Sequence, residues 1–168
     1  IPKYYDPTPD VKMRSFKDSC DLVSIQNLVE EGAIQITTGD EVGKLAYGTG
    51  PVSSVRTSDL GTYELKSDSK HAVGRDIWVA LAARQDVKVH DIMLVRDGTY
   101  LVGSSVLINE KDLPLLFCGG IYKIRILKKG RISPGLLYAL LNIDVVREQM
   151  RNKQFTRDVI DTLGHRLK

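Results

Sequence analysis

The first candidates for chemistry are two carboxylates and a lysine in one short polar stretch, Asp59, Glu64 and Lys66. Two acidic side chains can hold Mg²⁺ through their oxygens, and a nearby lysine can help to orient an attacking water. This set matches the residue types of a PD-(D/E)xK nuclease. The spacing is short, and such a pattern often arises by chance. The alternative interpretation is an exposed polar strand, and we expect no metal-dependent cleavage.

Other catalytic and cofactor motifs are missing from the sequence. None of the proline-containing segments has the Asp/Asn-Pro-Pro-Tyr/Phe tetrapeptide of a methyltransferase catalytic centre. The glycine-rich segment 39–50, GDEVGKLAYGTG, lacks the GxxxxGK[ST] and GxGxxG patterns of phosphate-binding loops. The two cysteines and three histidines do not have the spacing of metal ligands. We therefore expect no catalytic residues, no metal and no cofactor.

The composition is that of a soluble globular domain, with 42% apolar and 27% charged residues. No window approaches the roughly 18 consecutive apolar residues of a membrane span, and no signal peptide is visible. Because the chain begins at Ile1, we interpret 1–168 as a single domain that is a fragment of a longer polypeptide or a processed one. Cys20 and Cys118 are predicted to be buried or half-buried thiols in a reducing cytoplasm.

The charge is distributed unevenly, although its net value is only +3. Segment 121–168 has 11 Lys and Arg against 4 Asp and Glu, whereas 1–120 has 13 against 17. Such asymmetry can mark a region that faces a polyanion. It can equally be the solvated face of terminal helices, and composition does not decide between the two.

The elements that would position polar side chains centre on segment 91–108, DIMLVRDGTYLVGSSVLI. An apolar run at 92–95 is followed by the turn 96–99, in which Asp97-Gly98 is a hairpin signal. The return strand is predicted at 100–102 and 106–108, with a bulge or bend at 103–105. This hairpin would hold polar groups at the rim of a rigid sheet. An ordinary hairpin with a solvated tip is the alternative.

Strands and short helices are interspersed along the rest of the chain. Residues 1–9 are predicted to be extended because of their prolines, and 39–50 to be a long surface loop. Ser24 and Ser133 are predicted N-caps. The expected helices are 25–31, 75–84, 134–141 and 144–152, and the expected strands are 33–38, 51–60, 63–66, 113–117 and 121–127, with a turn segment at 155–164. This order predicts an α+β fold, a curved, mixed and mostly antiparallel sheet with several short packed helices.

One core shared by the sheet and the closing helix is expected. Residues 121–127 alternate as a half-buried strand would, and the apolar face of helix 134–141 is assigned to its leucines at 136, 137, 140 and 141. The residues predicted to be buried are Ile92, Leu94, Leu101, Val106, Tyr122, Ile124, Ile126, Leu137 and Leu140.

Four segments together resemble the target-recognition domains of type I restriction-modification specificity subunits and of adenine-specific DNA methyltransferases. The segments are 54–60, 91–99, 132–142 with the following Val145-Val146-Arg147, and 155–164. The resemblance covers most of 33–168 and lies in the order and spacing of loose apolar motifs. The family's final proline-ended strand, its long spacer helix and a second recognition domain are missing here, which indicates one recognition domain of a methyltransferase or specificity polypeptide.

The resemblance implies sequence-specific recognition of double-stranded DNA, in partnership with the methyltransferase domain or subunit of the parent system. The chemistry is compatible, because arginine can read guanine bidentately, while Ser, Thr and Asp can contact other base edges or phosphates. A non-catalytic protein-protein adaptor domain is the alternative function, and a Mg²⁺-dependent nuclease is a weaker one.

The expected DNA-binding residues lie on the glycine-rich loop, the loop after strand 51–60 and the Asp-Gly turn, whose tips could converge at one rim of the sheet. We expect them to form one concave, predominantly positive face. Arg56 and Arg96 are the base-reading candidates, and Lys44 and Lys70 the phosphate contacts; for Arg96 the alternative is a structural ion pair with Asp97 or Asp59. The full set is Lys44, Tyr47, Arg56, Thr57, Ser58, Lys70, Arg96, Asp97, Thr99 and Tyr100.

Overall fold

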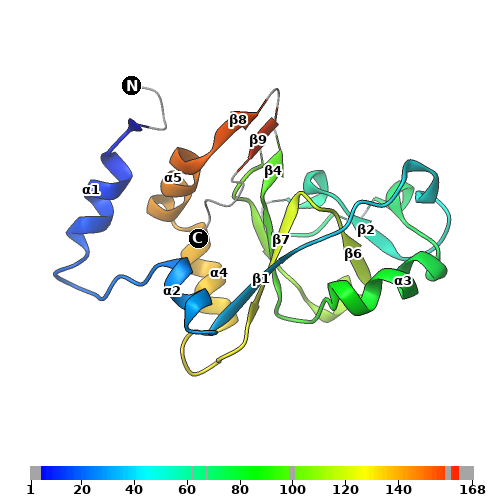
Figure 1. Cartoon of the computed structure of the whole chain (residues 1–168), viewed down its shortest axis with the longest axis horizontal. Helices are drawn as coiled ribbons and strands as arrows, with labels where there is room; N and C mark the ends of the chain where they lie inside the picture. The colour runs from blue at the N-terminus through cyan, green and yellow to red at the C-terminus, as the bar shows by residue number, and fades with distance from the viewer. Residues whose placement is uncertain (1–4, 62, 67, 99–100, 158–159, 163–168) are drawn as a thin grey trace.

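A four-stranded antiparallel sheet organises the fold. The computed structural model describes residues 5–61, 63–66, 68–98, 101–157 and 160–162. The sheet has the order β1 (Ile34–Thr38), β7 (Ile121–Ile126), β3 (Ile92–Val95), β5 (Ser105–Leu107) (Figure 1). Helices pack around this sheet, and the predicted α+β class with a mostly antiparallel sheet is confirmed.

The sheet is covered on both faces, so the expected single core is in fact divided. In β3, Ile92 and Leu94 belong to one apolar cluster, whereas Met93 and Val95 belong to another. This follows from the two-residue period of a strand, which sends successive side chains to opposite faces. The central strand β7 is accordingly buried on both faces at its start, and it is not the half-buried strand that its alternation predicts.

Helices α2 (Ile25–Glu30), α4 (Pro134–Asn142) and α5 (Asp144–Lys153) cover the first face. Their caps agree with the predictions: Ser24 Oγ accepts a hydrogen bond from Asn27 N at 3.0 Å, and Ser133 Oγ accepts one from Leu136 N at 3.2 Å. Gly32, with φ of +64°, allows the chain to leave α2 for β1.

A second, two-stranded sheet covers the other face, with β2 (Ser53–Val55) parallel to β6 (Leu115–Phe117). Helix α3 (Arg75–Gln85) packs on it through the partly buried Trp78 and its neighbours. The buried Lys123 of β7 donates to the main-chain oxygens of Gln85 and Asp86 at the end of α3. Arg125 Nη1 also donates to Asp86 Oδ2 at 2.6 Å, so polar groups as well as apolar ones attach the end of α3 to the central sheet. The same guanidinium makes a two-bond contact, at 2.8 and 2.7 Å, with buried Asp91 just before β3.

The central hairpin differs from its predicted form. β3 pairs with β5, and the reversal lies at 101–104, where Gly103 has φ of +87° and donates to Val95 O at 2.9 Å. The Asp-Gly pair is instead the short strand β4 (Asp97–Gly98), which pairs with β9 (Ile160–Thr162), itself paired with β8 (Phe155–Arg157). The predicted turn at 155–164 therefore contains two strands, because pairing between distant segments overrides the local turn signal.

Several smaller predictions are wrong for identifiable reasons. Leu136 and Leu140 are exposed, because helix α4 directs Leu137 and Leu141 into the core instead. Leu101 and Ile126, which were expected to be buried, are only half-buried. Residues 63–66 form one isolated bridge instead of a strand, and Cys20 is exposed, whereas Cys118 is half-buried as expected. Near the N-terminus, α1 (Thr8–Ser15) forms despite Pro9, because a proline in the first turn of a helix has no N–H that needs a partner.

Helix α1 lies at the edge of the molecule against α5 (Figure 1). Lys12 Nζ is 2.7 Å from a carboxylate oxygen of Glu148, and Asn152 Nδ2 donates to Asp6 O at 2.8 Å. Short helices η2 (Lys44–Ala46), η3 (Thr57–Asp59), η4 (Ser69–His71) and η5 (Glu110–Asp112) lie in the loops. No helix in the described ranges is both long enough and apolar enough to cross a membrane.

Candidate functional site

A hollow of about 640 Å³ lies where the ends of three strands meet. It contains five of the predicted recognition residues, on the loop after β2 and on the segment after β3. We call it the loop hollow, and it is lined by Glu41, Arg56, Thr57, Ser58, Arg96, Asp97, Gly98, Leu101, Cys118, Gly119 and Gly120.

The strand pairings explain why these loops converge. Because β2 and β6 are parallel, the residues after them leave the sheet side by side, and Cys118 N donates to Val55 O at 3.0 Å. Val95 of β3 lies opposite Ile121 of β7, so the chain after β3 meets the turn before β7. Gly120 O accepts hydrogen bonds from the next two main-chain amides after β3, at 2.9 and 3.1 Å.

Gly120 permits the close approach of the loops. A Cβ atom built on Gly120 would lie 2.8 Å from Cγ2 of Thr57, closer than two carbon atoms can approach without a shift. Thr57 is β-branched and thus has few alternative rotamers. A larger residue at position 120 would therefore push the Arg56 loop away from the turn before β7.

Arg56 is an exposed side chain held by two ring residues. Its Nη1 lies 3.2 Å from Nε2 of His71, and its guanidinium carbon is 5.9 Å from the centroid of the Tyr47 ring. The two rings meet edge to face with centroids 5.3 Å apart. A guanidinium only donates, so Nε2 of His71 accepts and the ring proton is assigned to Nδ1. The position of Arg56 is therefore set before any ligand binds.

Arg96 makes the structural ion pair that was considered as its alternative. Its Nε donates to Asp97 Oδ2 at 2.7 Å, and its Nη2 is 2.6 Å from the same oxygen. The guanidinium also lies over the ring of Tyr122, at 5.6 Å. Burial, partly opposed by neighbouring Arg96, raises the pKa of the Tyr122 hydroxyl above its usual value. Arg96 is half-buried and restrained, whereas Arg56 is exposed.

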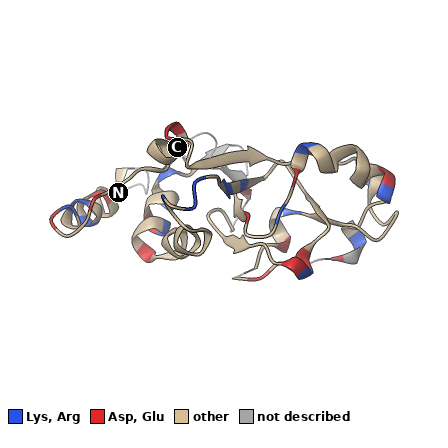
Figure 2. Cartoon of the chain, turned by 90° about the horizontal axis from the view of Figure 1, so that it is seen from below, with Lys and Arg blue, Asp and Glu red and all other residues tan. Residues whose placement is uncertain are grey.

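The charges that line the loop hollow are balanced, and the two lysines of the expected positive face, Lys44 and Lys70, are not among its lining residues. Glu41 and Asp97 offset Arg56 and Arg96. Glu41 also accepts a hydrogen bond from Gly119 N at 3.0 Å, which keeps its carboxylate at the wall. In Figure 2 both blue and red segments are scattered along the ribbon from one end of the molecule to the other.

The residues of the possible nuclease site have structural roles in this fold. Asp59 is buried, and its carboxylate accepts hydrogen bonds from Arg56 N at 2.8 Å and Ser58 Oγ at 3.2 Å. Glu64 and Lys66 are exposed and lie 3.6 Å apart as a surface ion pair. Within the described part of the chain, no group of three His, Cys, Asp or Glu side chains could hold a metal ion.

The predicted residues Lys44, Tyr47 and Lys70 are not among the residues that line the loop hollow. Lys44 on η2 and Lys70 on η4 are exposed, and their loops are joined by a hydrogen bond from Gly48 N to Ala72 O at 2.7 Å. Thr99 and Tyr100 fall outside the described residues. Sequence reasoning missed His71, because a lone histidine has no motif, and it missed the lining residues Glu41 and Cys118. Burial raises the pKa of the Cys118 thiol, which disfavours its thiolate form.

Comparison with known proteins gives a likeness of fold alone. No family model and no curated protein matches the sequence. Among solved structures, the chain is similar to the S subunit of a type I restriction-modification system from M. genitalium, with a TM-score of 0.54 and 11% sequence identity. The match covers 81% of this chain and 30% of that protein, so the chain corresponds to less than a third of its length.

Proposed function

We propose that this chain is a non-catalytic, sequence-specific DNA recognition module that directs an adenine methyltransferase or restriction-modification complex to its target. The observation that carries the proposal is the loop hollow, in which Arg56 and Arg96 lie with Thr57, Ser58 and Asp97 on converging loops. The fold likeness to a restriction-modification S subunit supports it. The module would act on double-stranded DNA in the cytoplasm, together with a methyltransferase domain or subunit.

The balanced charge of the loop hollow favours contacts with base edges over contacts with phosphates. Arginine can donate two hydrogen bonds to O6 and N7 of guanine, and a carboxylate can accept from the amino group of cytosine. A hollow with only positive charge would bind any duplex through its backbone. Glu41 and Asp97 weaken that general attraction while they add acceptors.

The side chains of Arg56 and Arg96 are restrained before DNA binds, as pre-organised base-reading residues would be. Holding Arg56 against Tyr47 and His71 lowers the conformational entropy that binding must remove. Arg96 is oriented by Asp97 in the same way. Both lie on loops that leave a rigid sheet, a setting in which specificity can vary without a change of fold.

Selection from a random duplex library by the full-length protein, with its methyltransferase partner where one is present, tests this function. We expect one enriched motif. Arg56→Ala and Arg96→Ala should each cost about 1–3 kcal/mol of binding free energy and relax one position of the motif. Arg131→Ala is the matched control, because Arg131 is an exposed arginine paired with Glu31 beyond the opposite end of β7. No enriched motif, or unchanged preference in both variants, would contradict the proposal.

A further inference from the structure

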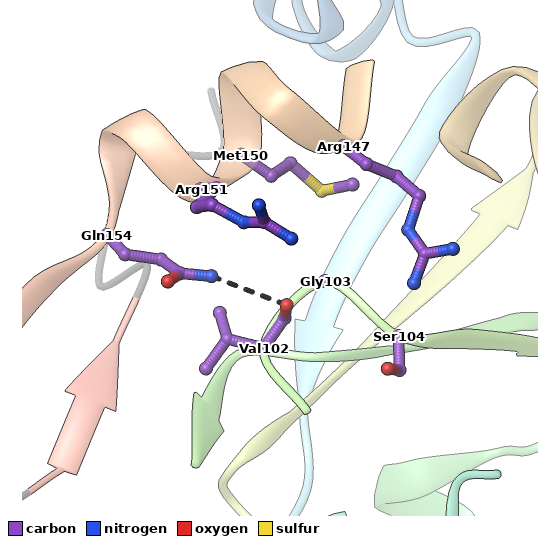
Figure 3. Close-up of a pocket in the computed structure, with 7 residues that line it drawn as sticks. All are labelled: Val102, Gly103, Ser104, Arg147, Met150, Arg151 and Gln154. Atoms are coloured by element: carbon purple, nitrogen blue, oxygen red, sulfur yellow. Dashed lines mark hydrogen bonds between the residues drawn. The ribbon is translucent and has the colours of Figure 1, made fainter. Parts of the chain in front are cut away.

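A second, smaller hollow lies between α5 and the reversal at 101–104, with a volume of about 120 Å³. We call it the arginine hollow. Figure 3 shows Arg147 and Arg151 extending from α5 toward this reversal. It is lined by Val102, Gly103, Ser104, Arg147, Met150, Arg151 and Gln154.

The arrangement of α5 explains why both arginines face the same hollow. Arg147 and Arg151 are four residues apart and therefore share one face of the helix. Buried Met150 packs against Gly103, where an added Cβ would lie 3.5 Å from its Cε atom. Gln154 Nε2 donates to Val102 O at 3.4 Å, and this contact fixes the end of the helix against the reversal (Figure 3).

Neither arginine is neutralised within the described part of the chain. No hydrogen bond or ion pair joins the guanidinium of Arg147 or Arg151 to a described residue. The one carboxylate between them on α5, that of Glu148, is paired with Lys12 of α1 at 2.7 Å. The arginine hollow is therefore a small concave site that has two positive groups and no acidic group in its lining.

We infer that the arginine hollow binds a phosphate group of the DNA backbone, an inference that rests on the proposed function. Guanidinium groups bind phosphate oxygens through paired, charge-assisted hydrogen bonds, and the small volume suits one oxyanion rather than an extended ligand. Leu101 lines the loop hollow, and its neighbour Val102 lines the arginine hollow. The two hollows therefore have neighbouring residues in their walls, and we expect one duplex to contact both.

The test is duplex binding by the full-length protein across a salt series, with two duplexes of unrelated sequence. We expect the double variant Arg147→Ala/Arg151→Ala to bind both duplexes at least about tenfold more weakly, because each substitution removes a charge-assisted hydrogen bond to phosphate. The slope of log affinity against log salt should fall by about 1. The double variant Arg147→Lys/Arg151→Lys should have an unchanged salt slope but a lower affinity, since lysine keeps the positive charge but cannot donate two parallel hydrogen bonds to phosphate as a guanidinium does.

The control is Lys153→Ala, which removes an exposed cation of α5 outside the lining of the arginine hollow. It should leave affinity and slope nearly unchanged. If the double alanine variant binds as the unchanged protein does, while the Arg56 and Arg96 variants are weakened, this inference fails and the proposed function stands.

If the protein binds no duplex, the proposed function fails, and the phosphate bound by the arginine hollow cannot be that of the DNA backbone. Titration with inorganic phosphate then tests the hollow alone. If phosphate shifts the NMR signals of the Gly103 and Ser104 amides, and these shifts are lost in Arg147→Ala/Arg151→Ala, the arginine hollow is an anion site that does not bind DNA. If phosphate causes no such shifts in the unchanged protein, the anion site is overturned as well.

Discussion

The two arginines of the loop hollow differ in how they are held, and this difference assigns a role to His71. Arg96 is fixed by its sequence neighbour Asp97, a pairing that the dipeptide itself suggests. Arg56 is held by His71, which is distant in sequence and becomes its neighbour only because β2 and η4 lie together in the fold. Sequence reasoning could therefore consider the first pairing and could not find the second.

His71 is predicted to be a positioning residue that acts through Arg56. His71→Ala should weaken DNA binding in the unchanged background, with a coupling to Arg56 of about 0.5–3 kcal/mol, and should have little further effect in Arg56→Ala. His71→Gln should retain more binding than His71→Lys, because glutamine can accept a hydrogen bond from Arg56 and lysine cannot. Equal losses in both backgrounds in a double-mutant cycle would mean that His71 acts independently of Arg56.

Lys123 is the clearest residue whose role the sequence misrepresents. An alternating strand predicts that its ammonium points to solvent, but the side chain is buried and donates to two main-chain oxygens at the end of α3. Burial lowers the pKa of Lys123 below its usual value. The hydrogen bonds offset the cost of burying a polar group, because main-chain oxygens at a helix end otherwise lack partners.

Lys123→Met should destabilise the fold by about 1–3 kcal/mol, since it removes the side-chain donor to the buried main-chain oxygen of Gln85. The main-chain oxygen of Asp86 keeps a second donor, Nη2 of Arg125. Lys128→Met is a matched control. Lys128 also donates to a main-chain oxygen near a helix end, that of Glu31, but both residues are exposed. Its loss should change stability by no more than about 0.5 kcal/mol. Urea unfolding of the two variants measures the difference, and similar losses would show that burial is not the deciding factor.

At the scale of elements, local signals predicted helices and caps well. Ser24, Gly32, Ser133 and the spacing of the apolar residues placed α2, α4 and α5 within one or two residues. The pairing of strands was harder, because an Asp-Gly pair specifies a turn only when its flanking segments pair with each other. Here β4 pairs with β9, which lies more than sixty residues later in the chain. Long-range contacts of this kind leave no local trace.

Helix α4 tests how finely a nearly all-apolar helix can be oriented from its sequence. Four leucines were assigned to its inner face, but only Leu137 and Leu141, spaced by four residues, reach the core. Leu141→Ala should cost about 2–5 kcal/mol of unfolding free energy. Leu140→Ala should cost clearly less, because Leu140 is 40% exposed. Thermal and urea unfolding would reveal a wrong helix rotation if the order of the two losses were reversed.

At the scale of the whole molecule, the two hollows would divide between them the two proposed kinds of DNA contact. The loop hollow has balanced charge and would supply sequence preference, while the arginine hollow has two cations and would supply general affinity. The excess of basic residues in 121–168 includes Arg147 and Arg151, which line the arginine hollow, and also members of surface ion pairs such as Arg131 with Glu31. Net charge along the sequence could not distinguish these uses, because partners are set by the fold.

The two hollows are predicted to contribute independently to DNA binding. Arg56 contacts His71 and Tyr47, and no described residue bonds both to Arg56 and to the arginines of α5. Changes at sites without shared partners usually add within about 0.3–0.5 kcal/mol. Combining Arg56→Ala with Arg147→Ala should therefore give the sum of the two separate losses in binding free energy, measured on one duplex at one salt concentration. A deviation larger than about 1 kcal/mol would mean that Leu101, in the wall of the loop hollow, and its neighbour Val102, in the wall of the arginine hollow, move together when DNA binds and couple the two hollows.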